Sequence, residues 1–210
     1  PAYHRLRGPN QWPPGQPSLQ PAIAEYTQHM LQVSSELTHA LCAALGLEHT
    51  ALDAWFAPTP HWQLKLASYQ PSTDAASTDA GGSAAAEAPV GVGAHTDSGF
   101  LTCLLQDEAG GLQAFTRGAW ATVPPLGPEW VVVNLGEVAE VASGGYLLAT
   151  PHRVLSTAAT RLSVPFFYNP SLETVVEPLA LPPSLAWERD AAYDSQTRPQ
   201  HVTRGHRRRP

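Results

Sequence analysis

The stretch GFLTCLLQDEAGGLQAF, residues 99–115, indicates the fold class of this chain. It holds two short apolar runs, Phe100 to Leu105 and Leu112 to Phe115, with an acidic turn and two glycines between them. Runs of this length bounded by turn residues are typical of β-strands, because helices need longer segments with three- and four-residue periodicity. The stretch therefore predicts two strands separated by a turn.

The same pattern continues along the chain from Gly91 onward. Further short apolar runs follow, with glycine, proline and polar residues between them: Trp130 to Leu135, Tyr146 to Ala149 and Leu162 to Tyr168. Strands at such regular spacing favour an antiparallel sandwich or barrel. We expect a mainly β fold with flanking α-helices, in which residues 91–171 form a double-stranded β-helix, or jelly-roll, core.

The first part of the chain predicts an arm followed by a helix. Proline is dense in residues 1–21, and its fixed backbone angle forbids a continuous helix there, so we expect an extended arm. Residues 22–46 predict a long amphipathic helix ending at Gly46, because apolar residues recur at three- and four-residue steps: Ile23, Tyr26, Met30, Val33, Leu37, Leu41 and Leu45. We expect Met30 and the histidines of this region to be packing or surface residues rather than ligands: His29, His39 and His49.

Composition defines the remaining segments. Residues 71–89 are rich in Ala, Ser, Gly and Asp and cannot bury a core, so they predict a flexible surface insert. Residues 200–210 are rich in arginine and predict a solvated basic tail. Before the insert, Trp62 to Tyr69 alternates enough to predict a strand. At 210 residues the chain fits one domain, and we expect a single domain over residues 1–210.

Composition also limits the expected partners. The formal net charge is -6 and the only dense basic run lies at the C-terminus, so nucleic-acid binding, which needs clustered Lys and Arg, is not expected. No window approaches the ~20 apolar residues of a membrane span, and we expect no membrane association. Cys42 and Cys103 are too few for a disulfide scaffold and lie among apolar residues, which predicts reduced packing residues and a cytoplasmic location.

Three residues form a candidate metal site. His95 and Asp97 are separated by one residue, so on extended backbone their side chains project to the same face. His152 follows several strand signals later, which suits a strand that folds back beside the first. Two imidazoles and one carboxylate suit Fe(II) and leave other positions open for further ligands, although Zn or Mn would also accept this set.

A second cluster lies on the strand predicted after His152. Arg161 and Ser163 are two residues apart, so strand alternation points both into the same cavity, together with Phe167. A guanidinium offers a planar fork for a carboxylate, and a hydroxyl adds one more hydrogen bond. The alternative for Arg161 is a surface salt bridge, but this residue opens an otherwise apolar strand, RLSVPFFYNP. We therefore expect a binding site for a carboxylate.

Four motifs extend this interpretation, in this order and spacing: GVGAHTDSGFLTCLLQDEAGGLQAF, WVVVNLGE, ATPHRV and RLSVPFFYNP. They resemble the Fe(II)- and 2-oxoglutarate-dependent oxygenases of the isopenicillin N synthase-like superfamily, most closely over residues 91–171. The resemblance implies that iron is bound by the catalytic residues His95, Asp97 and His152. It also implies that the distal carboxylate of 2-oxoglutarate is bound by Arg161 and Ser163, with a further hydrogen bond from Tyr69.

The resemblance implies an oxidoreductase of the dioxygenase type. Such an enzyme couples oxidative decarboxylation of 2-oxoglutarate to succinate and CO2 with hydroxylation or desaturation of a small organic substrate. We expect Fe(II) and 2-oxoglutarate as cofactor and co-substrate, ascorbate as a stimulant, molecular oxygen and a small molecule as partners, and a monomer. The chain departs from the family at Gln70, between Tyr69 and Pro71, and at Glu137, where aspartate is common. We also expect an upstream segment of the family to be truncated here, which would make the enzyme incomplete.

Two alternatives stay open at this point. The chain could be a 2-oxoglutarate-independent iron oxidase of the same fold, resembling isopenicillin N synthase or aminocyclopropane carboxylate oxidase, with Arg161 and Ser163 binding a substrate carboxylate. It could also be a non-catalytic metal-binding jelly-roll module. Whether oxygen uptake requires 2-oxoglutarate distinguishes the first alternative, and metal analysis with an optical titration distinguishes the second. The sequence does not indicate the primary substrate.

Overall fold

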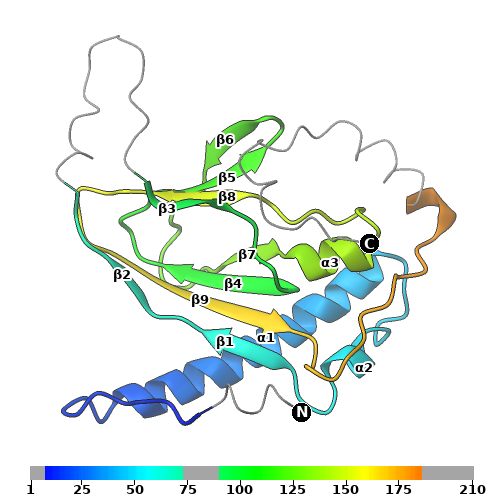
Figure 1. Ribbon diagram of the computed structural model, residues 1–210, viewed down its shortest axis with the longest axis horizontal. Coiled ribbons are helices and arrows are strands. Elements are labelled where there is room, and N and C mark those ends of the chain that lie inside the picture. Colours follow the sequence, from blue (N-terminus) through cyan, green and yellow to red (C-terminus); the bar gives the residue numbers. More distant parts are fainter. Residues whose placement is uncertain (1–7, 73–89, 186–210) are drawn as a thin grey trace, which may run out of the picture.

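Residues 8–72 and 90–185 are described by the structure, a computed structural model (Figure 1). The expected insert lies outside the described residues from residue 73 onward, as does the expected basic tail. The residues that are described before the first helix form no regular element apart from turns. This agrees with the proline-rich arm that the sequence predicts, as far as the described residues reach.

Two antiparallel sheets form the body of the fold. The major sheet has the order β1 (His61–Leu64), β9 (Arg161–Asn169), β4 (Leu101–Gln106) and β7 (Val132–Leu135), and β2 (Ala67–Tyr69) also pairs with β9. The minor sheet has the order β3 (Val90–His95), β8 (His152–Leu155), β5 (Leu112–Thr116) and β6 (Ala119–Thr122). The predicted jelly-roll core is confirmed.

Strand alternation gives the major sheet two different faces. Leu101 and Cys103 of β4 lie in one buried apolar cluster with Phe166 and Tyr168 of β9. Phe166 is fully buried and stacks on Trp62 of β1, with ring centroids 5.8 Å apart. Because side chains alternate along a strand, the intervening residues of β4 and β9 point to the opposite face. That opposite face, between the two sheets, carries the polar residues described below.

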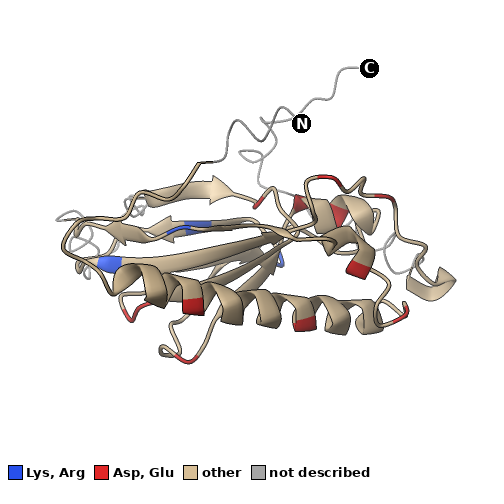
Figure 2. Cartoon of the chain, turned by 90° about the horizontal axis from the view of Figure 1, so that it is seen from below, with Lys and Arg blue, Asp and Glu red and all other residues tan. Residues whose placement is uncertain are grey.

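Helix α1 (Leu19–Ala44) lies across the apolar face of the major sheet (Figures 1 and 2). It begins before the expected residue 22, and Pro21 is accommodated in its first turn, where a backbone N–H has no partner within the helix. It ends before Gly46, which has a φ of 67° and closes the helix as expected.

The buried side of α1 differs from the apolar stripe that the sequence predicts. The buried residues are mostly small or polar: Thr27, Met30, Ser34, Thr38 and Cys42. Leu37 and Leu41 are only partly buried and flank this line. Small side chains along the contact line allow a helix to approach a sheet closely, with the larger apolar residues filling the space on either side. Met30 is thus a packing residue, as expected.

Three further expectations are corrected. Tyr146 to Ala149 is not a strand, because its backbone N–H groups are bound by side chains: Ser143 Oγ accepts from Leu147 and Glu140 Oε2 from Ala149, at 2.9 and 2.8 Å. The predicted strand Trp62 to Tyr69 is divided into β1 and β2. Two short helices, α2 (Asp53–Phe56) and α3 (Glu137–Ala142), and strand β6 lie in segments for which the sequence predicted no helix or strand.

The two cysteines are buried and unpaired, as predicted. Burial raises the pKa of both thiols, which keeps them protonated at neutral pH. Within the described residues, no helix is long and apolar enough to cross a membrane. Lys and Arg are few and dispersed in the described part of the chain, and acidic residues lie along α1 and the loops (Figure 2).

Replacing Phe166 by alanine is expected to destabilise the fold by about 3–5 kcal/mol, because it removes a fully buried ring from the contact between the major sheet and α1. Leu162→Ala is the control on the same strand, since Leu162 is 53% exposed and its loss is expected to cost within about 0.5 kcal/mol. Urea unfolding followed by circular dichroism measures both. Equal losses of stability in the two variants would contradict the burial of Phe166 in the core.

Candidate metal centre and anion pocket

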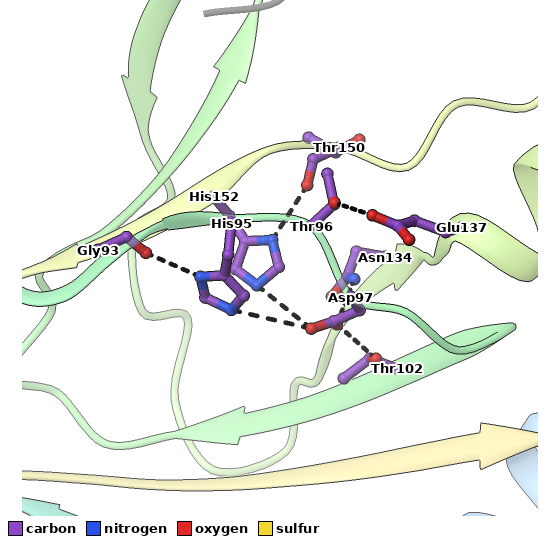
Figure 3. Close-up of polar contacts among 9 residues, drawn as sticks. All are labelled: Gly93, His95, Thr96, Asp97, Thr102, Asn134, Glu137, Thr150 and His152. Carbon is purple, nitrogen blue, oxygen red and sulfur yellow. Dashed lines mark hydrogen bonds and ion pairs between the residues drawn. The ribbon is translucent and has the colours of Figure 1, made fainter. Parts of the chain in front are cut away.

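The two sheets bring the three predicted metal ligands together (Figure 3). His95 at the end of β3 is the register partner of His152 at the start of β8, and Asp97 lies in the segment directly after β3. Asp97 Oδ1 is 3.9 Å from His95 Nε2 and 3.8 Å from His152 Nε2. One ligand atom from each residue lies within 4.8 Å of the other two, so a single ion can contact all three.

Hydrogen bonds fix the tautomer of both histidines. His95 Nδ1 lies 2.8 Å from the carbonyl oxygen of Gly93, and His152 Nδ1 lies 3.0 Å from that of Thr150. A carbonyl only accepts, so each Nδ1 is assigned the proton of the neutral imidazole and each Nε2 keeps its lone pair. Both lone pairs are on the nitrogens nearest Asp97, as a metal centre requires.

Asp97 is oriented in a comparable way. Its Oδ2 accepts hydrogen bonds from the Thr102 hydroxyl at 2.6 Å and from the Asn134 amide at 2.8 Å. Its Oδ1 is the oxygen nearest both Nε2 atoms (Figure 3). Asp97 is only 9% exposed, and these hydrogen bonds hold its carboxylate in one orientation. These residues fit a divalent metal ion, because two imidazole nitrogens and one carboxylate oxygen converge with no competing hydrogen-bond donor among the described residues.

The segment that carries Asp97 is held by the start of α3. The backbone N–H of Glu137 donates to the carbonyl of Asp97 at 2.8 Å, and Glu137 Oε1 accepts from the Thr96 hydroxyl at 2.6 Å. Gly136 must be glycine, because a Cβ at this position would overlap the backbone carbonyl of Gly99. Glu137 therefore has a structural partner in the segment that carries the metal ligands.

Thr102→Val is expected to weaken Fe(II) binding by about 10- to 100-fold, because the isosteric side chain removes one of the two donors that orient Asp97. Fe(II) affinity can be measured anaerobically by competition with a chromogenic chelator. Thr38→Val serves as the control, since this buried hydroxyl donates to the carbonyl of Ser34 within α1, on the opposite face of the major sheet. Wild-type affinity in Thr102→Val would show that the Thr102 hydroxyl does not position Asp97.

Arg161 is almost completely buried, at 1% exposed, on the face of β9 that lies between the sheets. Its Nε donates to the carbonyl of Gly110 at 2.7 Å and its Nη2 to Gln106 Oε1 at 3.1 Å. Its Nη1 is buried and has no hydrogen-bond partner among the described residues. Gly110 and Gly111 have φ values of 76° and 87°, so the turn that presents the Gly110 carbonyl depends on glycine.

No carboxylate within the described ranges forms a salt bridge with Arg161. The nearby Asp107 instead accepts the backbone N–H groups of Leu162 and Ala109, at 2.6 and 3.1 Å. Burial lowers the pKa of the Arg161 guanidinium, and the nearby Tyr69 and Asp107 act in the opposite direction. An arginine nevertheless stays charged in proteins. A buried cation with a free donor and no counter-ion is a site prepared for an anion.

A cavity of about 100 Å³ connects Arg161 to the metal ligands. Its lining includes the polar residues Tyr69 and Ser163, and the Arg161 Cζ lies 5.2 Å from the centroid of the Tyr69 ring. Leu104 and Phe167 supply apolar walls, and Phe167 thus points into the cavity as expected. Phe100, which directly precedes β4, lies in the core, where its ring meets Phe56 at a centroid distance of 5.4 Å.

A second, larger cavity of about 680 Å³ lies on the other side of the ligands and shares His95, Asp97 and Phe167 with the first. Its lining combines neutral polar and apolar side chains, among them Gln63, Asn169 and Val138. The candidate ligands thus face two spaces. The smaller one ends at a buried cation, and the larger one has room for a small organic molecule.

Sequence reasoning missed Thr102, Asn134 and Gln106. Each is a polar residue in an otherwise apolar strand, in LTCLLQ or in VVNL. Alternation also places Thr102 and Gln106 on one face of β4, the face opposite Cys103. That signal was available in the sequence. The partner of each side chain was not, because it depends on strands that are distant along the chain.

A jelly-roll that presents two histidines and a carboxylate on one side of an open space belongs, by fold and ligand set, to the class of mononuclear non-haem iron proteins. The family model of the 2OG-Fe(II) oxygenase superfamily matches residues 63–170 of the chain. The chain belongs to this superfamily. The matched region contains all three candidate ligands as well as Arg161 and Ser163.

Curated and solved relatives agree with this membership. A homoarginine-6-hydroxylase of Glycine max is 32% identical over 83% of this chain and 52% of its own length. A 1-aminocyclopropane-1-carboxylate oxidase of Musa acuminata is 30% identical over 83% of this chain and 55% of its own length. The crystal structure of JOX2 with 2OG, Fe and JA superposes with a TM-score of 0.71 at 27% identity, over 84% of this chain and 50% of that one. The chain thus spans about half the length of the curated relatives it matches.

Proposed function

We propose that the chain is the catalytic part of an Fe(II)- and 2-oxoglutarate-dependent oxygenase, which couples oxidative decarboxylation of 2-oxoglutarate to succinate and CO2 with hydroxylation or desaturation of a small organic substrate. The observation that carries this proposal is the buried, uncompensated Arg161, with its free Nη1, in the same cavity as the three metal ligands. A generic metal site needs no such cation. A dicarboxylate that reaches from the metal to the guanidinium accounts for both the metal site and the buried cation.

Each residue has a definite task in this proposal. His95, Asp97 and His152 hold Fe(II) through the three atoms that their other hydrogen bonds leave free. Bound Fe(II) supplies the oxygen activation that protein side chains cannot provide. Arg161 and Ser163 bind the distal carboxylate of 2-oxoglutarate, which directs its keto-acid end toward the ligands, and Tyr69 adds a hydrogen bond to that carboxylate.

The larger cavity is the proposed site of the primary substrate. It opens on His95 and Asp97, so a molecule within it would present a carbon atom to the metal. Phe167 borders both cavities, where its ring separates the co-substrate from the substrate and limits the access of water. The two spaces allow both molecules to be bound at once, which a coupled reaction requires.

The proposed activity is tested by reconstituting the purified chain with Fe(II), ascorbate and 2-oxoglutarate, and then measuring succinate and oxygen uptake with a panel of small organic compounds. We expect succinate to form, with stimulation by a subset of the panel, and oxygen uptake to require 2-oxoglutarate. The Asp97→Asn variant provides the background. Succinate formation at the level of that background throughout the panel would contradict the proposal.

A 2-oxoglutarate-independent iron oxidase is the second candidate, supported by the similarity to aminocyclopropane carboxylate oxidase. In that case Arg161 and Ser163 would bind a carboxylate of the substrate itself. The same assay separates the two functions. For the second candidate, oxygen uptake would proceed with a carboxylate substrate and ascorbate and would not depend on 2-oxoglutarate.

The domain organisation, oligomeric state, location and partners of the enzyme are also proposed. We propose a single domain over residues 1–210 that acts as a cytoplasmic monomer on a small molecule and molecular oxygen, without nucleic acid or membrane partners. The few, dispersed basic residues of the described part support the absence of a nucleic-acid surface (Figure 2). Light scattering of the purified chain tests the monomer, and a dimer mass at micromolar concentration would contradict it.

A further inference from the structure

Gln106 lies outside the predicted site and contacts Arg161 directly. It is the last residue of β4, is 6% exposed, and is the register partner of Ser163 on β9. Its side-chain oxygen accepts from Arg161 Nη2 at 3.1 Å. Its side-chain nitrogen is buried and has no partner among the described residues. Gln106 does not line the cavity itself, so it can act on a bound anion only through Arg161.

The contact restricts how Arg161 can present its donors. A guanidinium has five N–H groups, of which Nε–H is used by the Gly110 carbonyl and one Nη2–H by Gln106. The two hydrogens of Nη1 and the second hydrogen of Nη2 remain. One hydrogen of each Nη atom points to the terminal edge of a guanidinium, where a carboxylate can bind end-on with both oxygens.

The neutrality of Gln106 is as important as its position. A glutamine accepts a hydrogen bond without carrying a negative charge, so Arg161 is oriented while its positive charge stays available. A glutamate in the same place would make a stronger bond and would also supply a buried counter-ion. The free energy that favours an incoming carboxylate comes from the absence of that counter-ion.

We propose that Gln106 is a positioning residue that sets both the orientation and the uncompensated charge of Arg161, and thereby determines the affinity for 2-oxoglutarate. The inference rests on the proposed function, since it takes 2-oxoglutarate as the ligand of Arg161. It goes beyond that function by assigning the strength of co-substrate binding to a residue that touches neither the co-substrate nor the metal.

Gln106→Glu and Gln106→Leu test the proposal, because charge and hydrogen bonding change separately. Glutamate keeps the acceptor for Nη2 but neutralises Arg161, so we expect 2-oxoglutarate to bind about 100-fold more weakly, with a melting temperature at or above that of the wild type. Leucine removes the acceptor but adds no charge, so we expect a loss of about 10-fold. A merely structural role gives the reverse order, with glutamate near the wild type and leucine weakest.

The measurement is a titration of the anaerobic, Fe(II)-loaded chain with 2-oxoglutarate, followed by the visible charge-transfer band of the bound complex. Fe(II) affinity is measured separately and should be unchanged in both variants. Gln113→Glu is the matched control, because Gln113 Oε1 accepts from Arg153 Nε at 2.8 Å but neither residue lines the cavity. We expect wild-type binding of 2-oxoglutarate in this control.

The outcomes separate this inference from the proposed function. If the wild-type chain binds Fe(II) but not 2-oxoglutarate, the proposed function fails and the inference fails with it. If the wild type binds both Fe(II) and 2-oxoglutarate, but Gln106→Glu binds 2-oxoglutarate as tightly as the wild type does, only the inference is overturned. If Gln106→Glu does not fold, Gln106→Leu decides, since unchanged 2-oxoglutarate affinity in that variant also overturns it.

Discussion

Asp97→Asn is expected to weaken Fe(II) binding by more than about 100-fold, because changes to the partners of a metal ligand alone cost 10- to 100-fold. The substitution is nearly isosteric, and the donors around it determine how it acts. Thr102 and Asn134 both donate to Oδ2, so the carbonyl oxygen of an asparagine would take that position. Its NH2 group would then face the two Nε2 atoms, placing donors where the metal requires a negatively charged acceptor.

The test is an anaerobic Fe(II) titration of wild-type and variant chains, with circular dichroism to establish that both are folded. Asp53→Asn is the control, since Asp53 pairs with His39 at 2.8 Å at the surface and has no contact with the centre. It should bind Fe(II) as the wild type does. An Asp97→Asn variant that binds Fe(II) within about threefold of the wild type would remove Asp97 from the ligand set.

Arg161→Ala is expected to weaken 2-oxoglutarate binding by about 100-fold or more while leaving Fe(II) affinity within about twofold of the wild type. Among the described residues the guanidinium is the only buried cation that lines the cavity, and alanine removes the charge and the planar fork that pair with the distal carboxylate. Arg161→Lys should give an intermediate affinity, because it retains the charge but loses the planar fork.

Two controls separate a specific loss of 2-oxoglutarate binding from misfolding and from the loss of one positive charge. The alanine variant also frees the Gly110 carbonyl and Gln106, so its melting temperature must be measured alongside the binding. Arg117→Ala, at an exposed turn between β5 and β6, controls for the loss of one positive charge and should bind 2-oxoglutarate normally. An unchanged 2-oxoglutarate dependence in a folded Arg161→Ala variant would refute its assignment as the carboxylate partner.

The candidate ligands could be predicted because local rules determine where they lie. Arg161 and Ser163 share a face through strand alternation, and both line the expected cavity. His95 and His152 become register partners because an antiparallel strand folds back beside the first, as the spacing predicts. These inferences need only the alternation of one strand or the pairing of two.

Other features depend on contacts between segments that are distant along the chain, so the sequence did not predict them. The buried line of α1 runs through Ser34 and Thr38 because the surface of the sheet, rather than the periodicity of the helix, decides which side is covered. The orientation of Arg161 depends on a carbonyl at Gly110 and an amide at Gln106, each on another element. Hydrophobic periodicity carries no information about such polar contacts.

The central claim is that one cavity holds both Fe(II) and 2-oxoglutarate. The most direct measurement is an anaerobic titration of the chain with Fe(II) and then with 2-oxoglutarate, followed by visible absorption. We predict a charge-transfer band that needs both components, saturates at one equivalent of each, and is lost in Asp97→Asn and weakened in Arg161→Ala. Tight binding of one Fe(II) with no band at saturating 2-oxoglutarate would contradict the claim.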